Sequence, residues 1–168
     1  IRDPRKPACG IVDQVVRSID LAPTLLELVG ASPAASMEGV SLAACFGQRQ
    51  HCPQLDAFNE TGMWIADIPG LPEKHLRYPD LLELMEVPDR ASGTLAIKPQ
   101  YQDTILRAKD RMIRRGRWKL VYQPLETGYL LRLFDLDTDP ACQQDVSGSH
   151  LDVKAELWEH LQEYLGQE

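Results

Sequence analysis

The sequence predicts an α+β protein whose second half folds as a small antiparallel sheet of about four strands covered by a C-terminal helix. Strand-like runs follow one another across residues 110–136 with turn residues between them. After residue 149 the apolar side chains recur at helical spacing. With 168 residues, 43% of them hydrophobic and 26% charged, the chain is long enough to bury a core.

The predicted sheet begins with a strand at residues 55–58. It continues with three runs at 110–114, 117–122 and 131–136. Gly116 separates the first two of these runs, and glycine can take the positive φ that a tight hairpin needs. Residues 126–128, which end in Gly128, supply the next turn. The order of runs and turns therefore predicts an antiparallel meander.

The last predicted element is a helix with Ser149 as its N-cap. Its apolar stripe consists of Leu157, Trp158, Leu161, Tyr164 and Leu165. A helix with one such stripe needs an apolar surface to cover, and the meander provides one. Between the first strand and the meander, residues 62–99 contain five prolines, which predicts an irregular insertion with at most one short helix at 80–85.

The first 50 residues form a separate predicted part, with residues 51–168 as the second. Residues 1–10 are rich in proline and basic side chains and are expected to form an extended connector, and 14–17 is a short strand candidate. Asp20 suits the N-cap of a helix that ends at Gly30, and Pro23 is tolerated in its first turn. This helix is almost entirely apolar, so we expect it to lie against a large partner surface.

Composition excludes several classes of function. The formal net charge of −7 gives no general reason to bind nucleic acid or anionic lipid, and no apolar run is long enough to span a membrane. The four cysteines show no CxxC pair and no dense framework, so free thiols and a slight preference for a reducing, cytoplasmic compartment are expected. The compartment otherwise stays open between cytoplasm and periplasm.

A search for catalytic motifs in the sequence finds no phosphate-binding loop, no GxSxG elbow, no HExxH and no calcium-binding EF-hand. Asp135, Asp137 and Asp139 alternate after a strand, where aspartates ordinarily supply turn and cap oxygens. No catalytic residue and no metal ligand is therefore assigned within this chain.

Five segments, in this order and spacing, resemble the C-terminal portion of the sulfatase family, which belongs to the alkaline phosphatase superfamily. They are IRDP at 1–4, VRSIDLAPTLLELVG at 16–30, MEGVSL at 37–42, RRGRWKLVY at 114–122 and LFDLDTDP at 133–140. The resemblance implies the C-terminal part of an alkaline-phosphatase-like α/β fold, with residues 1–50 as a strand and helix remnant of the catalytic domain. It spans nearly all of the chain.

The resemblance implies a hydrolase that cleaves sulfate esters with a divalent metal, usually calcium, and a formylglycine made from a [CS]-x-P-[ST]-R motif. That motif is missing here, so the nucleophile and the metal ligands are expected in a missing N-terminal catalytic portion, which is the expected partner together with a sulfate-ester substrate. Three alternatives stay open: a phosphodiesterase or phosphonate monoester hydrolase on the same fold, a non-catalytic interaction module, and assembly into a homo-oligomer.

Members of the family often build part of the substrate pocket from this region, which directs attention to residues 59–64 and to one histidine. Trp64 is a candidate stacking wall for a ring-bearing sulfate ester, with a loop anchor as the alternative. His75 is a candidate donor to sulfate oxygens, with an exposed loop histidine as the alternative. Asn59 completes the predicted substrate-binding set, whereas Glu60 would repel an anion and is expected to be structural.

Overall fold

The computed structural model describes residues 11–46, 52–64 and 68–166. The chain divides into two compact units, the first made of Ile1–Ala57 with Arg114–Arg117 and the second of Phe58–Ile113 with Trp118–Glu168. The predicted domain boundary after residue 50 stays a prediction. The predicted connector at 1–10 lies outside the described residues.

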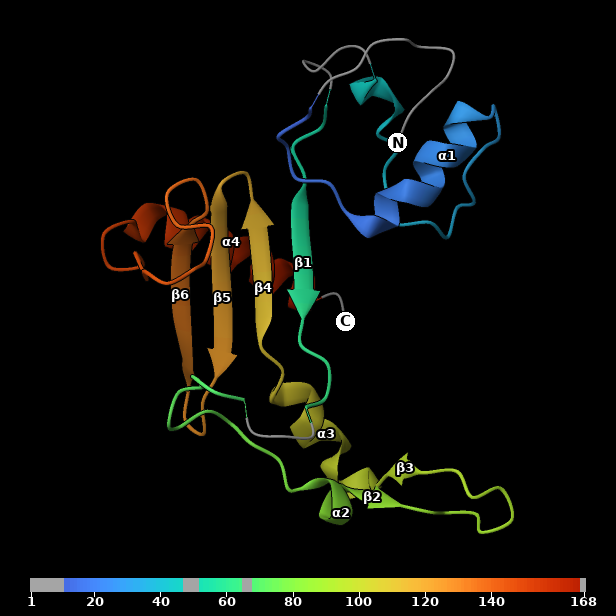
Figure 1. Cartoon of the computed structure of the whole chain (residues 1–168), viewed down its shortest axis with the longest axis vertical. Coiled ribbons are helices and arrows are strands. Elements are labelled where there is room, and N and C mark those ends of the chain that lie inside the picture. Colours follow the sequence, from blue (N-terminus) through green and yellow to red (C-terminus); the bar gives the residue numbers. More distant parts are fainter. Residues whose placement is uncertain (1–10, 47–51, 65–67, 167–168) are drawn as a thin grey trace. The chain divides into compact units, whose positions relative to one another are not determined.

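Four strands form one antiparallel sheet in the order β1-β4-β5-β6 (Figure 1). Their bounds are Asp56–Glu60 for β1, Arg111–Arg115 for β4, Trp118–Pro124 for β5 and Tyr129–Asp135 for β6. The two predicted turns are confirmed, because Gly116 and Gly128 both take positive φ. β5 and β6 pair in antiparallel register, with Leu120 opposite Leu133. The predicted small antiparallel sheet is therefore confirmed.

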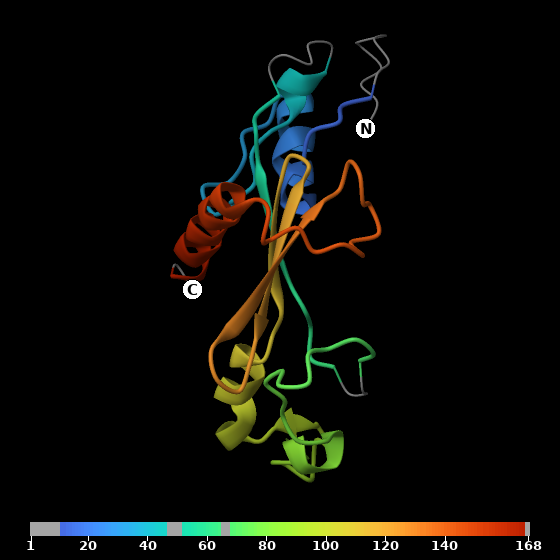
Figure 2. The same cartoon turned by 90° about the vertical axis from the view of Figure 1, so that its left-hand side faces the viewer.

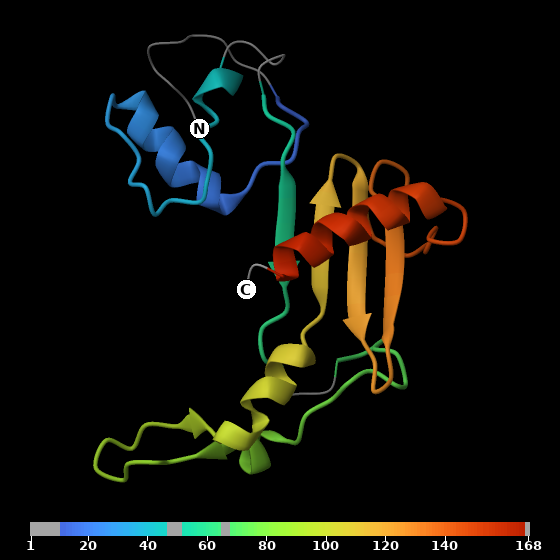
Figure 3. The ribbon, with the colours of Figure 1, turned by 180° about the vertical axis from the view of Figure 1, so that it is seen from behind.

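The C-terminal helix α4, Leu151–Leu165, covers one face of this sheet (Figure 3) and lies to one side of it in the view of Figure 2. Its Leu157 and Leu161 are buried against a row of sheet residues made of Ile113, Leu120 and Leu133. The apolar stripe of α4 thus covers the sheet, as the sequence predicts. The predicted cap is wrong: the N-cap is His150, and the Ser149 hydroxyl instead donates to the carbonyl of Val146.

The insertion contains more structure than the prolines predict. The expected short helix is α2, Leu81–Leu84, capped by the Asp80 side chain. Two short strands, β2 (Met85–Glu86) and β3 (Ala96–Ile97), pair as a hairpin. Helix α3, Pro99–Arg107, was not predicted; Pro99 starts it because the first turn of a helix needs no N–H from that position.

In the first unit the short helix η1, Ser18–Asp20, leads into α1, Leu21–Leu28. Gly30 ends α1 as predicted, with a positive φ and its N–H on the Glu27 carbonyl. The strand predicted at 14–17 is wrong, since these residues form no ladder within the described part of the chain. Two β-branched valines favour an extended strand, but a strand also needs a hydrogen-bonded neighbour.

Asp20 stands at the N-cap position of α1, but its carboxylate does not cap the helix. It accepts hydrogen bonds from the Arg17 side chain and from the backbone N–H of Val40, and it is fully buried. Thr24 makes a parallel link, because its hydroxyl accepts from the Leu42 N–H. Together Asp20 and Thr24 tie α1 to the segment 39–42, an arrangement that the prediction of a simple N-cap missed.

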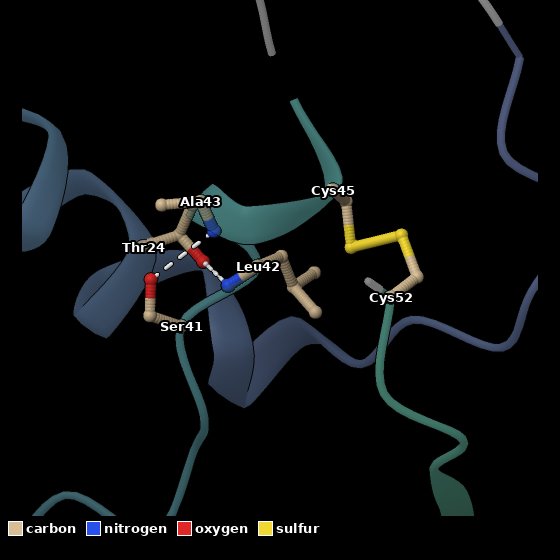
Figure 4. The surroundings of a disulfide bond; sticks show 6 residues. All are labelled: Thr24, Ser41, Leu42, Ala43, Cys45 and Cys52. Atoms are coloured by element: carbon tan, nitrogen blue, oxygen red, sulfur yellow. Dashed lines mark hydrogen bonds between the residues drawn. A yellow bond between two sulfur atoms is a disulfide. The ribbon is translucent and has the colours of Figure 1, made fainter. Parts of the chain in front are cut away.

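The expectation of free thiols is wrong for two of the four cysteines. Cys45, at the end of the short helix η2 (Ala43–Cys45), forms a disulfide with Cys52 (Figure 4). In the same view Leu42 N–H points to the Thr24 hydroxyl. Cys142 is free, and Cys9 lies outside the described residues. The spacing of single cysteines gave no signal for this pair, because disulfide connectivity depends on the folded path of the chain.

Candidate functional site

The candidate site lies on the face of the sheet opposite α4, at one end of the strands. Side chains alternate between the two faces of a strand. Tyr122 of β5 stacks on Trp158 of α4, which places the next residue, Gln123, on the opposite face. Phe58 of β1 stacks on Tyr164 of α4, which places Asn59 on that opposite face as well.

His75 lies at this end of the sheet and is 1% exposed. Its segment continues the sheet, because His75 bridges to Leu125 and the Leu76 N–H donates to the Pro124 carbonyl. Both ring nitrogens face oxygen atoms: Nδ1 lies 2.8 Å from the Leu76 carbonyl and Nε2 lies 2.6 Å from Asp110 Oδ1. A carbonyl can only accept, so Nδ1 carries a proton.

Asp110, which directly precedes β4, connects several segments. Its second oxygen, Oδ2, accepts from Gln123 Nε2 at 2.9 Å. Its backbone N–H donates to the Thr61 hydroxyl at 3.0 Å, and its carbonyl accepts from the Thr61 N–H at 2.9 Å. We call the side chains of His75, Asp110 and Gln123 the His75 network. It joins the insertion to the sheet through hydrogen bonds to a carboxylate, which are stronger than neutral ones.

Trp64 packs beside this network. Its ring meets the His75 ring edge-on with centroids 5.5 Å apart, and it lies 4.9 Å from the Tyr78 ring. The Tyr78 hydroxyl donates to the Trp64 carbonyl and accepts from the Trp64 N–H, at 2.8 and 2.6 Å. Burial raises the pKa of Tyr78 above its ordinary value, although its bond with Trp64 opposes the shift. Tyr78 therefore stays protonated and fixes the backbone of Trp64.

Asn59 is exposed on β1. It also borders a hollow of about 250 Å³ that lies on the α4 side of the sheet, because Leu161 and Tyr164 of α4 help to line it. The other lining residues are Phe58, Glu60, Arg111, Leu161 and Tyr164. Glu60 forms ion pairs with Lys109 and with Arg111, which agrees with the structural role expected for it. The polar groups at this edge of the sheet are thus largely matched among themselves.

The structure brings two of the three predicted substrate residues into contact, Trp64 and His75, and places Asn59 on β1. His75 is not the exposed loop histidine that was weighed as the alternative. Sequence reasoning missed Asp110, Gln123 and Tyr78. An aspartate just before a strand and a glutamine within one give no signal, because their roles depend on the path of the insertion.

The carboxylates of the described residues do not cluster. Within residues 11–46, 52–64 and 68–166 no three His, Cys, Asp or Glu side chains gather as a ligand set. Asp135 and Asp139 instead accept from the N–H groups of Asp137 and Gln144, which confirms their turn roles.

No helix in the described residues has the length and apolarity to cross a bilayer.

Comparison with solved structures identifies the fold. A sulfatase candidate from Bacteroides thetaiotaomicron matches with a TM-score of 0.53 and 21% identity, over 88% of this chain and 24% of its own. A 2-O GAG sulfatase matches with 0.52 and 20% over the same shares. A phosphonate monoester hydrolase from Silicibacter pomeroyi matches with 0.50 and 18%, again over 88% and 24%. No family model and no curated protein matches.

The chain therefore has the fold of the C-terminal part of sulfatase-like structures, as the sequence predicts. At these identities the likeness concerns the fold. The chain spans 24% of the length of the solved sulfatase and phosphonate hydrolase chains, so roughly three quarters of the fold has no counterpart within it.

Proposed function

We propose that this chain is the C-terminal portion of a sulfatase that hydrolyses sulfate esters, and that it shapes part of the substrate pocket while the remaining portion performs the chemistry. The observation that carries the proposal is the match to two sulfatase structures over 88% of the chain. In the proposed enzyme, formylglycine and calcium belong to the N-terminal portion. The chain described here supplies neither the nucleophile nor the metal ligands and is inactive alone.

The substrate-binding residues proposed within this chain are Asn59, Trp64 and His75. Trp64 offers an aromatic ring beside polar groups, an arrangement that suits a ring-bearing ester. Asn59 is exposed and can donate to a hydroxyl or sulfate oxygen. His75 has both ring nitrogens engaged with Leu76 and Asp110, so its proposed contribution is to hold Trp64 rather than to touch the sulfate group.

The proposed partner is the N-terminal catalytic portion, and the first unit provides a surface for it. Apolar side chains of α1 and its neighbours are strongly exposed, with Leu25 at 52% and Val29 at 77%. Further exposed apolar residues of this unit are Ile11, Val16, Ile19, Leu21, Met37 and Val40. Many exposed apolar side chains on one small unit are typical of an interface. It counts against a free-standing interaction module, while a homo-oligomer would bury it too.

A phosphonate monoester hydrolase is the second candidate, because the solved phosphonate hydrolase matches almost as well as the sulfatases, with a TM-score of 0.50 against 0.53. The described residues that this chain would contribute, an aromatic ring and an amide, do not discriminate sulfur from phosphorus. The choice between the two reactions therefore depends on the portion that carries the nucleophile.

The test compares this chain with the longer product of its own gene. Both are purified and assayed with an aryl sulfate and an aryl phosphonate monoester, with calcium, magnesium or manganese added. We expect turnover by the longer product alone, faster on the sulfate ester. Turnover by the rigorously pure 168-residue chain would contradict the proposal. Faster turnover of the phosphonate ester by the longer product would favour the second candidate, a phosphonate monoester hydrolase.

Variants in the longer product test the pocket residues. Trp64→Ala is expected to raise KM about tenfold. The reason is that losing an aromatic stacking contact with the substrate costs about 1.4 kcal/mol of binding free energy. The matched control is Leu151→Ala, which removes a side chain that is exposed on α4. An unchanged KM in Trp64→Ala would remove Trp64 from the pocket without affecting the assignment of the reaction.

A further inference from the structure

We infer that the His75 network is a positioning relay: it fixes the Trp64 ring at the end of the sheet and thereby sets where the ring of a substrate binds. The identity of the substrate in this inference rests on the proposed function, but the position of the Trp64 ring can be tested without any substrate. His75 contacts Trp64, Asp110 bonds to the segment that carries Trp64, and Gln123 bonds to Asp110. None of the three belongs to the apolar core under α4.

The hydrogen bonds make Asp110 the centre of the relay. Asp110 Oδ1 is hydrogen-bonded to His75 Nε2, and Asp110 Oδ2 accepts a hydrogen bond from Gln123 Nε2 of β5. The backbone of Asp110 exchanges two bonds with Thr61, three residues before Trp64. Three segments distant in sequence therefore meet at one residue, and a displacement of any one of them reaches Trp64 through short, directional bonds.

The chemistry of the network favours a positioning role over simple anchoring. Apolar side chains of similar volume often hold a loop as well as a buried ionic group does, because a buried ionic group must first lose its hydration. Hydrogen bonds add what apolar packing lacks, which is a defined direction for each group. A network that holds a loop by a His and a carboxylate is thus suited to fixing the geometry of the neighbouring Trp64 ring.

Gln123 carries a second indication. Its amide must point Nε2 toward Asp110, because a carboxylate oxygen accepts and does not donate. That orientation leaves Gln123 Oε1 buried without a partner in the described residues, and the side chain is only 7% exposed. Buried acceptors are rarely left unpaired. Oε1 is therefore a buried acceptor beside the relay that suits a bridging water molecule.

The first test uses the full 168-residue chain labelled with 5-fluorotryptophan, whose three tryptophan resonances are assigned by Trp→Phe variants. His75→Asn keeps a donor for the Leu76 carbonyl but cannot reach Asp110, whereas His75→Gln can place its amide at the position of Nε2. We expect His75→Asn to split or broaden the Trp64 resonance, with the other two unchanged. In His75→Gln we expect a single sharp Trp64 line, displaced from its wild-type position because the neighbouring imidazole ring is gone. Equal spectra for the two variants would overturn the relay.

A second variant keeps the inference falsifiable if His75→Asn does not fold. Gln123→Met removes only the outer hydrogen bond and keeps the length of the side chain. Movement of the Trp64 resonance in this variant supports the relay, and an unmoved resonance contradicts it. Asp110→Asn can still donate to Nε2 and accept from Gln123, so it should leave the resonance in place.

The longer enzyme gives the functional readout. His75→Asn is expected to raise KM for an aryl sulfate about tenfold with little change in kcat, as the loss of one charge-assisted hydrogen bond would do, and His75→Gln to stay within about threefold. A fall in kcat at constant KM would contradict positioning. If no form of the enzyme turns over sulfate or phosphonate esters, the proposed function fails while the fluorine spectra still decide the relay.

Discussion

Gly39→Ala is the sharpest perturbation of the first unit. A Cβ at this position would lie 2.0 Å from the Ile19 carbonyl oxygen and 2.5 Å from its carbon, and 3.0 Å from the backbone nitrogen of Asp20. All three are backbone atoms, so no flexible side chain can move aside. Gly39 does not have a positive φ, hence the objection to alanine is purely steric.

The cost can be worked from the neighbouring contacts. Relief of the overlap requires the separation from the Ile19 carbonyl oxygen to grow by about 1.4 Å, from 2.0 Å to the 3.4 Å at which ordinary van der Waals contact begins. The next residue, Val40, donates its N–H to Asp20 Oδ1 at 2.9 Å, and this bond would be lost. A hydrogen bond to a charged group contributes about 1.5–3 kcal/mol, and the lower entropy of an unfolded alanine returns about 0.4–1 kcal/mol. We expect a net destabilisation of about 2 kcal/mol.

The assay is amide hydrogen exchange at Val40, read by NMR in the 168-residue chain. A loss of about 2 kcal/mol in local stability corresponds to about 30-fold faster exchange. Gly62→Ala is the matched control, because a Cβ at Gly62 meets nothing within 4 Å and its φ is not positive. Unaltered exchange of Val40 in Gly39→Ala would refute the proposed close approach of 39–42 to η1.

Two further predictions concern a carboxylate and the core. Burial would raise the pKa of Asp20, but hydrogen bonds from Arg17 and Val40 outweigh it and hold the pKa below its ordinary value. Its contribution to stability is therefore present above the unfolded pKa of about 3.9 and is lost as the pH falls through the lower folded pKa. The Val40 amide shift should follow this loss in the wild type but not in Asp20→Asn, and an identical acid response of both would contradict the assignment. Leu161→Ala, at a side chain 1% exposed, should cost about 2–5 kcal/mol in urea unfolding, whereas Leu151→Ala, at 60% exposure on the same helix, should cost under 1 kcal/mol; equal costs would place the core elsewhere.

The sheet and α4 could be predicted from sequence because local and tertiary signals coincide there. Gly116 and Gly128 take the positive φ that tight hairpin turns favour, and they bound the run that forms β5. The apolar stripe of α4 has one surface to cover, since the sheet presents Ile113, Leu120 and Leu133 on a single face. The local turn and helix preferences agree with the tertiary packing in this part of the chain, and such agreement allows a fold to be predicted from sequence.

Prediction failed where the deciding partner is distant in sequence. The segment 14–17 has the composition of a strand, yet strand formation depends on a neighbour that the described residues do not provide. Asp20 has the residue type and position of an N-cap. Its two carboxylate oxygens instead accept hydrogen bonds from Arg17 and Val40, so the carboxylate does not cap the helix N–H groups. Composition cannot reveal such competition.

The candidate site shows the same limit more strongly. Trp64 and His75 were singled out as residues of an irregular segment, which is where functional side chains concentrate. What holds them is the carboxylate of Asp110, 35 residues beyond His75 in the chain. The residue types at a site can be proposed from sequence, whereas the hydrogen bonds that orient them require the path of the chain.

The two units are stabilised in different ways, and the difference bears on how the chain works. The second unit encloses its own core between the sheet and α4. In the first unit polar links from Asp20 and Thr24 fix the local path, while Leu25 and Val29 remain exposed. Polar links define a conformation but bury little apolar area, so the first unit gains most from a companion surface. The second unit, which carries the His75 network, therefore supports its own core, whereas the first unit leaves apolar side chains such as Leu25 and Val29 exposed.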